Sequence, residues 1–112
     1  MDIKNEISNG MAIYRIAGRI DALTSQNLES AVDSALNGGS PRVIFDMSGV
    51  TYVSSAGLRG ILSTAKRAKA AKGGLAVFGL QSSVNEVFEI SGFQNIIPIV
   101  KDESEARSRL GA

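Results

Sequence analysis

Apolar residues flank Asn9-Gly10 on both sides near the start of the chain. Asn-Gly accommodates the positive φ angles that a type I′ turn requires at both central positions. The pattern therefore predicts an N-terminal β-hairpin formed by residues 3–8 and 11–17.

Apolar positions spaced three and four residues apart follow, and they predict a helix over residues 25–36. Thr24 is placed as its N-cap, with Leu23 and Leu28 as the two partners of a hydrophobic staple. The Asn-Gly-Gly-Ser-Pro run at residues 37–41 ends this helix and leads into a short loop.

A second amphipathic helix is predicted to begin at Ser54 or Ser55 and to end near Ala71. Its buried face is formed by residues with helical spacing, Leu58, Ile61, Leu62 and Ala65. A serine at the head of this helix lies beside unpaired N–H groups and the positive end of the helix dipole. These surroundings favour an added anion.

Three further apolar segments, residues 42–47, 75–80 and 96–100, predict strands, and Pro98 places the last one at a sheet edge. Two shorter helices are expected. One has a capping box of Ser83 and Glu86 and ends at Gly92. The other covers residues 104–110. Together the elements predict one α/β domain over residues 1–112, with a mixed sheet, an N-terminal hairpin and about four helices.

The composition excludes several kinds of chemistry. The 112 residues include no histidine and no cysteine, which removes the usual transition-metal ligands, the commonest general base and all thiol chemistry. No phosphate-binding glycine loop is present. We therefore expect neither an enzyme nor a metal or cofactor site. No run of eighteen apolar residues and no secretory signal are found, so we expect a cytoplasmic protein without membrane insertion.

Charge is unevenly distributed although the net charge is only +1. Residues 38–85 contain six Lys or Arg and one Asp, and most of the cations fall on the second predicted helix. A nucleic-acid interface would need a strongly basic domain or aromatic side chains along the patch. We interpret the basic residues as a solvated helix face and expect no nucleic-acid partner.

Three motifs, in order, resemble the signature of the STAS domain and specifically of the bacterial anti-sigma factor antagonists. The first is Gly18-Arg19-Ile20-Asp21, and the last is Phe88-Glu89-Ile90-Ser91-Gly92-Phe93. Between them, the pattern of an acidic strand end followed by Ser-(Ser/Ala)-Gly-Leu is matched by Asp46, Ser55, Ala56, Gly57 and Leu58.

The resemblance implies a phosphorylation-switched binding module. Unphosphorylated, it would bind an anti-sigma factor that is also an ATP-using serine kinase, and so release a sigma factor; a serine phosphatase would reset it. Ser55 matches the phosphorylated serine, and Asp21 and Asp46 match acidic positions that help to position its hydroxyl. The partner-binding residues implied are Ser54, Ser55, Ala56, Gly57 and Arg59.

Two departures from the family pattern leave alternatives open. Ser54 stands where many antagonists have Asp, and Ala56 replaces a second serine, so Ser54 or Thr51 could be the phosphate acceptor instead. STAS domains also serve as scaffold subunits of signalling or membrane-transport assemblies, in which the serine need not be phosphorylated. Direct nucleotide binding is a third interpretation.

Overall fold

The arrangement of helices and strands is seen in a computed structural model, which describes residues 1–111 apart from the side chain of Ser8. The strands are β1 (Asp2–Ser8), β2 (Met11–Ile20), β3 (Arg42–Val53), β4 (Gly74–Phe78) and β5 (Ile99–Val100). The helices are α1 (Ala22–Asn37), α2 (Ser55–Ala70), α3 (Ser82–Ser91) and α4 (Glu103–Arg109), with a 3₁₀ turn η1 at Phe93–Asn95.

The strands form one mixed sheet in the order β1-β2-β3-β4-β5. The hairpin of β1 and β2 is antiparallel, and every later neighbour pairs in parallel. Asn9 and Gly10 have φ angles of 53° and 76°, as expected for a type I′ turn. The predicted α/β fold with a mixed sheet and an N-terminal hairpin is thus confirmed, and so is the position of Pro98 next to an edge strand.

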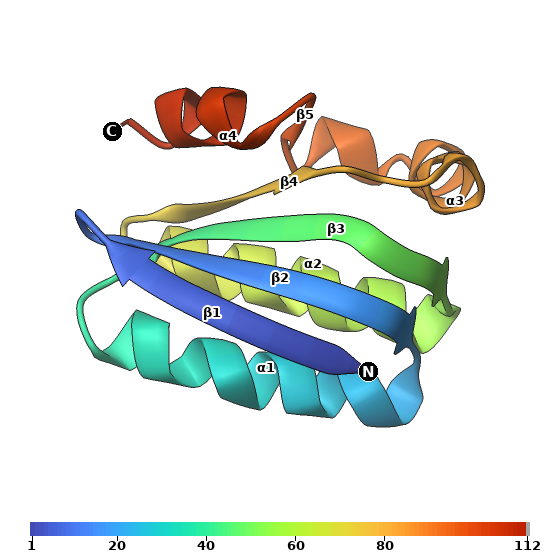
Figure 1. Ribbon diagram of the computed structural model, residues 1–112, viewed down its shortest axis with the longest axis horizontal. Helices are drawn as coiled ribbons and strands as arrows, with labels where there is room; N and C mark the ends of the chain where they lie inside the picture. The colour runs from blue at the N-terminus through green and yellow to red at the C-terminus, as the bar shows by residue number, and fades with distance from the viewer. Residues whose placement is uncertain (112) are drawn as a thin grey trace.

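The two faces of the sheet are covered unequally. Helices α1 and α2 pack side by side across one face, and α4 lies on the other face near β4 and β5 (Figure 1). The larger core lies beneath α1 and α2 and is centred on Tyr14, Phe45 and Ile61, with Phe88 of α3 closing one end. A smaller cluster around Ile13 and Ile44 lies beneath α4. Part of the second face stays open.

Helix α1 begins three residues before the predicted start. Its N-cap is Asp21, not Thr24, and the Thr24 side chain closes a capping box by accepting the Asp21 N–H at 2.8 Å. The predicted staple of Leu23 with Leu28 is also wrong, because Leu23 is 71% exposed while Leu28 is buried. The capping box, rather than an apolar contact, fixes where this helix begins.

Two other boundaries differ from prediction. Strand β3 does not end at Met47 but continues to Val53, because Ala17–Ile20 of β2 pair with its second half across two irregularities in register. Helix α3 has Gln81 at its N-cap with no side-chain hydrogen bond, so the predicted capping box of Ser83 and Glu86 is wrong. Its end at Gly92, with φ of 72°, is as expected.

Candidate functional site

The N-terminal end of α2, called the head of α2 below, is hydrogen-bonded to the end of strand β2 through Ser54. Its Oγ accepts the N–H of Gly57 at 3.0 Å, which makes Ser54 the N-cap. Its own N–H donates to the carbonyl oxygen of Ile20 at 2.9 Å, extending the pairing of Ile20 with Val53 by one hydrogen bond. The first turn of α2 therefore has a fixed position relative to β2.

Ser55 is the first residue of α2, and its side chain is exposed. Among residues 1–111, no hydrogen bond engages its hydroxyl, because Ser54 provides the cap. The N–H groups of Ser55 and Ala56 precede the first intrahelical hydrogen bond, which Leu58 donates to Ser54. The hydroxyl of Ser55 thus stands free at the positive end of a sixteen-residue helix.

Gly57 allows the helix to approach the sheet this closely. A Cβ atom added to it would lie 2.3 Å from the carbonyl oxygen of Ile20, a distance that no side chain tolerates. The next residue, Leu58, is buried in the main core. The predicted Ser-Ala-Gly-Leu segment therefore has an exposed start, and its glycine and leucine dock the helix.

Asp21 lies next to this site through the sheet register, because the neighbouring Ile20 pairs with Val53 and accepts the Ser54 N–H. Its carboxylate caps α1, accepting the N–H of Thr24 at 3.0 Å and that of Leu23 at 3.2 Å. The backbone hydrogen bond from Thr24, followed by that from its hydroxyl, holds the pKa of Asp21 below its ordinary value. Asp21 is an anion beside the predicted site; its influence on the Ser55 hydroxyl stays a prediction.

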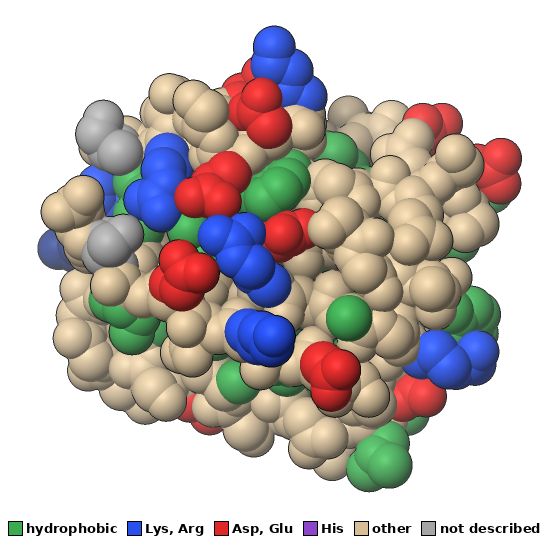
Figure 2. Space-filling model, viewed as in Figure 1, with side chains coloured by type: hydrophobic (Ala, Val, Ile, Leu, Met, Phe, Trp, Pro, Cys, Tyr) green, Lys and Arg blue, Asp and Glu red, His purple; other side chains and the backbone are tan. Residues whose placement is uncertain are grey.

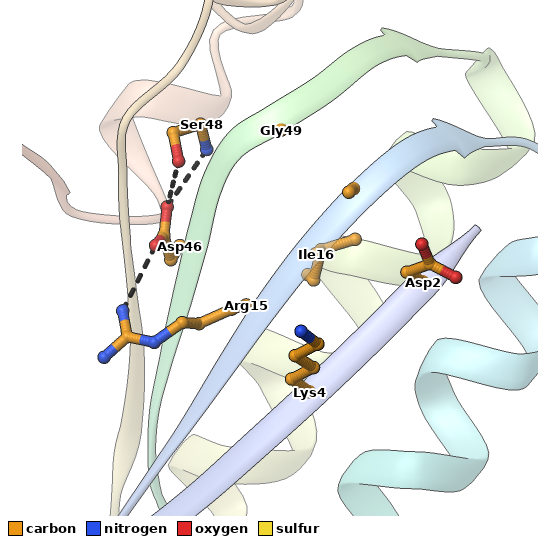
Figure 3. A pocket seen from close by; sticks show the side chains of 8 residues that line it. Asp2, Lys4, Arg15, Ile16, Asp46, Ser48 and Gly49 are labelled. Atoms are coloured by element: carbon orange, nitrogen blue, oxygen red, sulfur yellow. Dashed lines mark hydrogen bonds and ion pairs between the residues drawn. The ribbon is translucent and has the colours of Figure 1, made fainter.

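Asp46 lies elsewhere. Asp46 precedes Ser54 by eight positions, with the seven residues between them all in β3, which is roughly 26 Å along an extended strand. Its carboxylate accepts Ser48 Oγ at 2.7 Å and Arg15 Nη1 at 3.2 Å (Figure 3). The hydrogen bonds of the Asp46 carboxylate go to Ser48 and Arg15 and not to Ser55, so its predicted role in positioning the Ser55 hydroxyl stays a prediction.

The surroundings of Asp46 form a charged cluster that the sequence did not reveal. Arg15 also pairs with Glu103 of α4 at 3.1 Å and with Glu6 of β1 at 3.6 Å, joining elements that are distant in the chain. Acidic and basic side chains gather on this side of the molecule (Figure 2). A hollow of about 320 Å³ lies beside them, lined by Asp2, Lys4, Arg15, Ile16, Ala17, Asp46, Ser48 and Gly49 (Figure 3).

Two groups of this cluster, Asp46 and Arg15, have pKa values shifted toward their charged forms. Partial burial opposes the charge on Asp46, but hydrogen bonds from Ser48 and Arg15 outweigh it, so the pKa of Asp46 lies below its ordinary value. The pKa of Arg15 is raised, chiefly by its hydrogen bond to Glu103. These charges bridge β1, β2, β3 and α4 and are best understood as structural.

Two further features near the head of α2 were not predicted. The Arg19 guanidinium stacks over the Tyr52 ring, 4.3 Å from its centroid, and Tyr52 is 43% exposed. Beside it, a small apolar hollow of about 180 Å³ separates the end of β3 from α3. Only the pairing of β2 with the unpredicted half of β3 brings Arg19 and Tyr52 together.

The remaining predicted residues fall into two groups. Arg59 is exposed on α2, one turn after Ser55, as predicted for two residues four positions apart. Thr51 lies within β3 instead, where its hydroxyl donates to the Gly18 carbonyl at 3.4 Å. Of the alternative phosphate acceptors, Ser54 uses its hydroxyl as a cap and Thr51 is outside the helix.

Within the described part of the chain, no acidic side chains cluster as they would around a metal ion. No helix of residues 1–111 is long and apolar enough to cross a membrane.

Comparison with known proteins bears on this site. The STAS domain model matches residues 2–106. The chain is 36% identical over 98 residues to BtrV, a candidate anti-sigma factor antagonist of Bordetella bronchiseptica, covering 88% of this chain and 84% of that protein. It is 29% identical over 105 residues to the anti-sigma-B factor antagonist of Listeria monocytogenes, covering 94% and 91%.

Solved structures share the fold. A candidate anti-sigma factor antagonist of Thermotoga maritima superposes with a TM-score of 0.90 at 19% identity, covering 98% of this chain and 95% of that one. The antagonist SpoIIAA in its unphosphorylated form gives a TM-score of 0.75 at 16% identity, covering 99% and 100%. With the family model spanning nearly all of its length, the chain belongs to the STAS domain family.

Proposed function

We propose that the chain is an anti-sigma factor antagonist whose binding is switched by phosphorylation of Ser55. In its unphosphorylated form it binds an anti-sigma factor with serine kinase activity through the head of α2, and a sigma factor is released. Phosphorylation by that kinase, with ATP, ends the binding, and a serine phosphatase restores it. The names of the relatives support the antagonist role.

The observation that carries the proposal is that two adjacent serines use their hydroxyl groups differently. The Ser54 hydroxyl accepts a hydrogen bond from the Gly57 N–H, while the Ser55 hydroxyl is exposed and forms no hydrogen bond with the described residues. A phosphate on Ser55 therefore costs the fold no existing hydrogen bond. A phosphate on Ser54 would remove the cap of α2.

Electrostatics explains how such a modification would switch binding. A phosphate adds roughly −1.5 to −2 charge to the first turn of α2, where Ser55, Ala56 and Gly57 carry no charge. The positive end of α2 tolerates the anion, so the domain stays folded. A partner that covers the same surface would have to desolvate the phosphate without an adequate counter-charge, which costs several kcal/mol of affinity.

The chain acts by binding and not by catalysis in this proposal. The role requires no cofactor and no metal, and its site of action is the cytoplasm, where sigma factors work. The competing scaffold role predicts the same fold and the same exposed helix head, but no phosphate transfer. The two roles therefore differ in one measurable reaction.

The test is incubation of the protein with the anti-sigma factor kinase of its host and ATP, followed by intact-mass analysis. We expect one phosphate on wild type and on Ser54→Ala, and none on Ser55→Ala. Phosphate on Ser55→Ala but not on Ser54→Ala would move the site to Ser54. Absence of phosphate from wild type, with binding retained, would favour the scaffold role.

A further inference from the structure

One face of α2 continues from Ser55 along the helix axis. Arg59, Leu62 and Lys66 follow at four-, three- and four-residue intervals, so they lie in one row with Ser55. A shallow groove of about 370 Å³ runs along this row, lined by Arg59, Leu62, Ser63, Lys66 and Arg67. From Ser55 to Lys66 the row is roughly 16 Å long at the rise of an α-helix.

Two of the three cations that line this groove, Arg59 and Lys66, have no salt-bridge partner among residues 1–111. Helix α2 contains no acidic residue. Arg67 at the groove edge is paired with Asp33 of α1, but no carboxylate of residues 1–111 forms a salt bridge with Arg59 or Lys66. By contrast, Arg15 and Arg107 both have acidic partners. Two cations with a half-buried leucine between them thus face outward in line with Ser55.

We infer that this row is the docking surface for an acidic protein partner. Carboxylates of the partner would contact Arg59 and Lys66, and an apolar side chain would rest on Leu62. The inference rests on the proposed function, because it assigns the partner's footprint from Ser55 along α2. It adds the chemistry of the partner surface: acidic groups flanking an apolar one, about two helical turns apart.

A protein partner fits this row better than a nucleic acid does. Nucleic-acid grooves combine a longer run of cations with aromatic side chains for stacking, and α2 has no aromatic residue. The apolar Leu62 at the centre is a feature of protein interfaces, in which a polar rim surrounds an apolar contact.

The experiment is a titration calorimetry series with the host anti-sigma factor at several salt concentrations. We expect Lys66→Glu to weaken binding about ten-fold at low salt, with a smaller loss at high salt, because the added carboxylate repels an acidic surface. Lys101→Glu is the matched control: it makes the same change in net charge on an exposed lysine next to α4, on the other face of the sheet, and should bind like wild type.

A second variant tests the apolar part of the footprint. Leu62→Ala should weaken binding without changing its salt dependence, since no charge is altered. Ile90→Ala is its control, because Ile90 is 87% exposed on α3 and lies outside the row.

The outcomes separate this inference from the proposed function. If wild type binds the anti-sigma factor and Ser55 controls the binding, but Lys66→Glu behaves like Lys101→Glu, the inference alone is overturned. If wild type does not bind, both are overturned. Displacement of the anti-sigma factor by duplex or single-stranded DNA at comparable concentration would assign the row to nucleic acid and also overturn the inference.

Discussion

Gly57 of α2 packs directly against the backbone of β2 at Ile20, whose carbonyl oxygen lies 2.3 Å from where a Cβ atom would stand. That oxygen also accepts the Ser54 N–H, so it cannot withdraw without breaking the bond. We therefore expect Gly57→Ala to lower the free energy of unfolding by about 1–3 kcal/mol and to displace Ser55.

Urea unfolding followed by circular dichroism measures this loss. Gly74→Ala is the control, because its Cβ would meet only the flexible end of the Leu110 side chain, at 3.3 Å. If Gly57→Ala lowers the free energy of unfolding no more than Gly74→Ala does, α2 can move away from Ile20 without loss of stability.

The two serines at the head of α2 should respond differently to alanine. Ser54→Ala removes the side-chain cap and should cost about 0.5–2 kcal/mol of stability. Ser55→Ala removes no hydrogen bond of the described residues and places a better helix former in the first turn, so its melting temperature should equal or exceed that of wild type. Differential scanning calorimetry of both variants is the check, and equal destabilisation would contradict the assignment of Ser54 as the cap.

A carboxylate at position 55 should separate folding from binding. Ser55→Glu places an anion at a helix N-terminus, which is favourable by about 0.3–1 kcal/mol, so the melting temperature should hold. Its affinity for the anti-sigma factor should fall. Ser82→Glu makes the same change at the first, exposed residue of α3 and serves as the control. Wild-type affinity in Ser55→Glu would argue against an electrostatic switch at this residue.

The charged cluster on the open face predicts a pH dependence of stability. Because the pKa of folded Asp46 is depressed, its contribution is complete above its unfolded value of about 3.9 and is lost as the pH falls through the folded pKa. Asp46→Asn should therefore be less stable than wild type at pH 6 and lose less stability on acidification. Urea unfolding of wild type and Asp46→Asn at pH 6, 4 and 3 measures how the free energy of unfolding of each protein changes with pH. If the two proteins lose the same free energy between pH 6 and pH 3, Asp46 does not contribute to the acid sensitivity.

Local signals were sufficient for much of the fold. Asn9-Gly10 determined the hairpin, and the apolar spacing of Leu58 and Ile61 determined the buried face of α2. Boundaries failed where a tertiary partner decides the outcome. The segment after Met47 contains small polar residues typical of a loop, yet β2 supplies it with backbone partners and makes it a strand.

The same distinction between local and tertiary signals applies to the candidate site, of which only the arrangement along one helix could be predicted from the sequence. Ser55 and Arg59 lie on one helix, so their spacing alone determines their relation. Asp46 is close to Ser55 in sequence and distant in space, because the intervening residues form an extended strand instead of a loop. Asp46 and Glu103 lie 57 residues apart in sequence and pair with the same arginine, Arg15, a relation that leaves no trace in any local pattern.

The backbone tie between Ser54 and Ile20 has a consequence for substrate recognition. Protein kinases that read linear motifs bind their substrates as extended segments, and this tie denies them that conformation at Ser55. An enzyme that modifies Ser55 must accept a folded helix end, and a phosphatase must do the same. A short peptide with the sequence of residues 50–60 would carry every local residue of the motif and still lack the shape that such an enzyme reads.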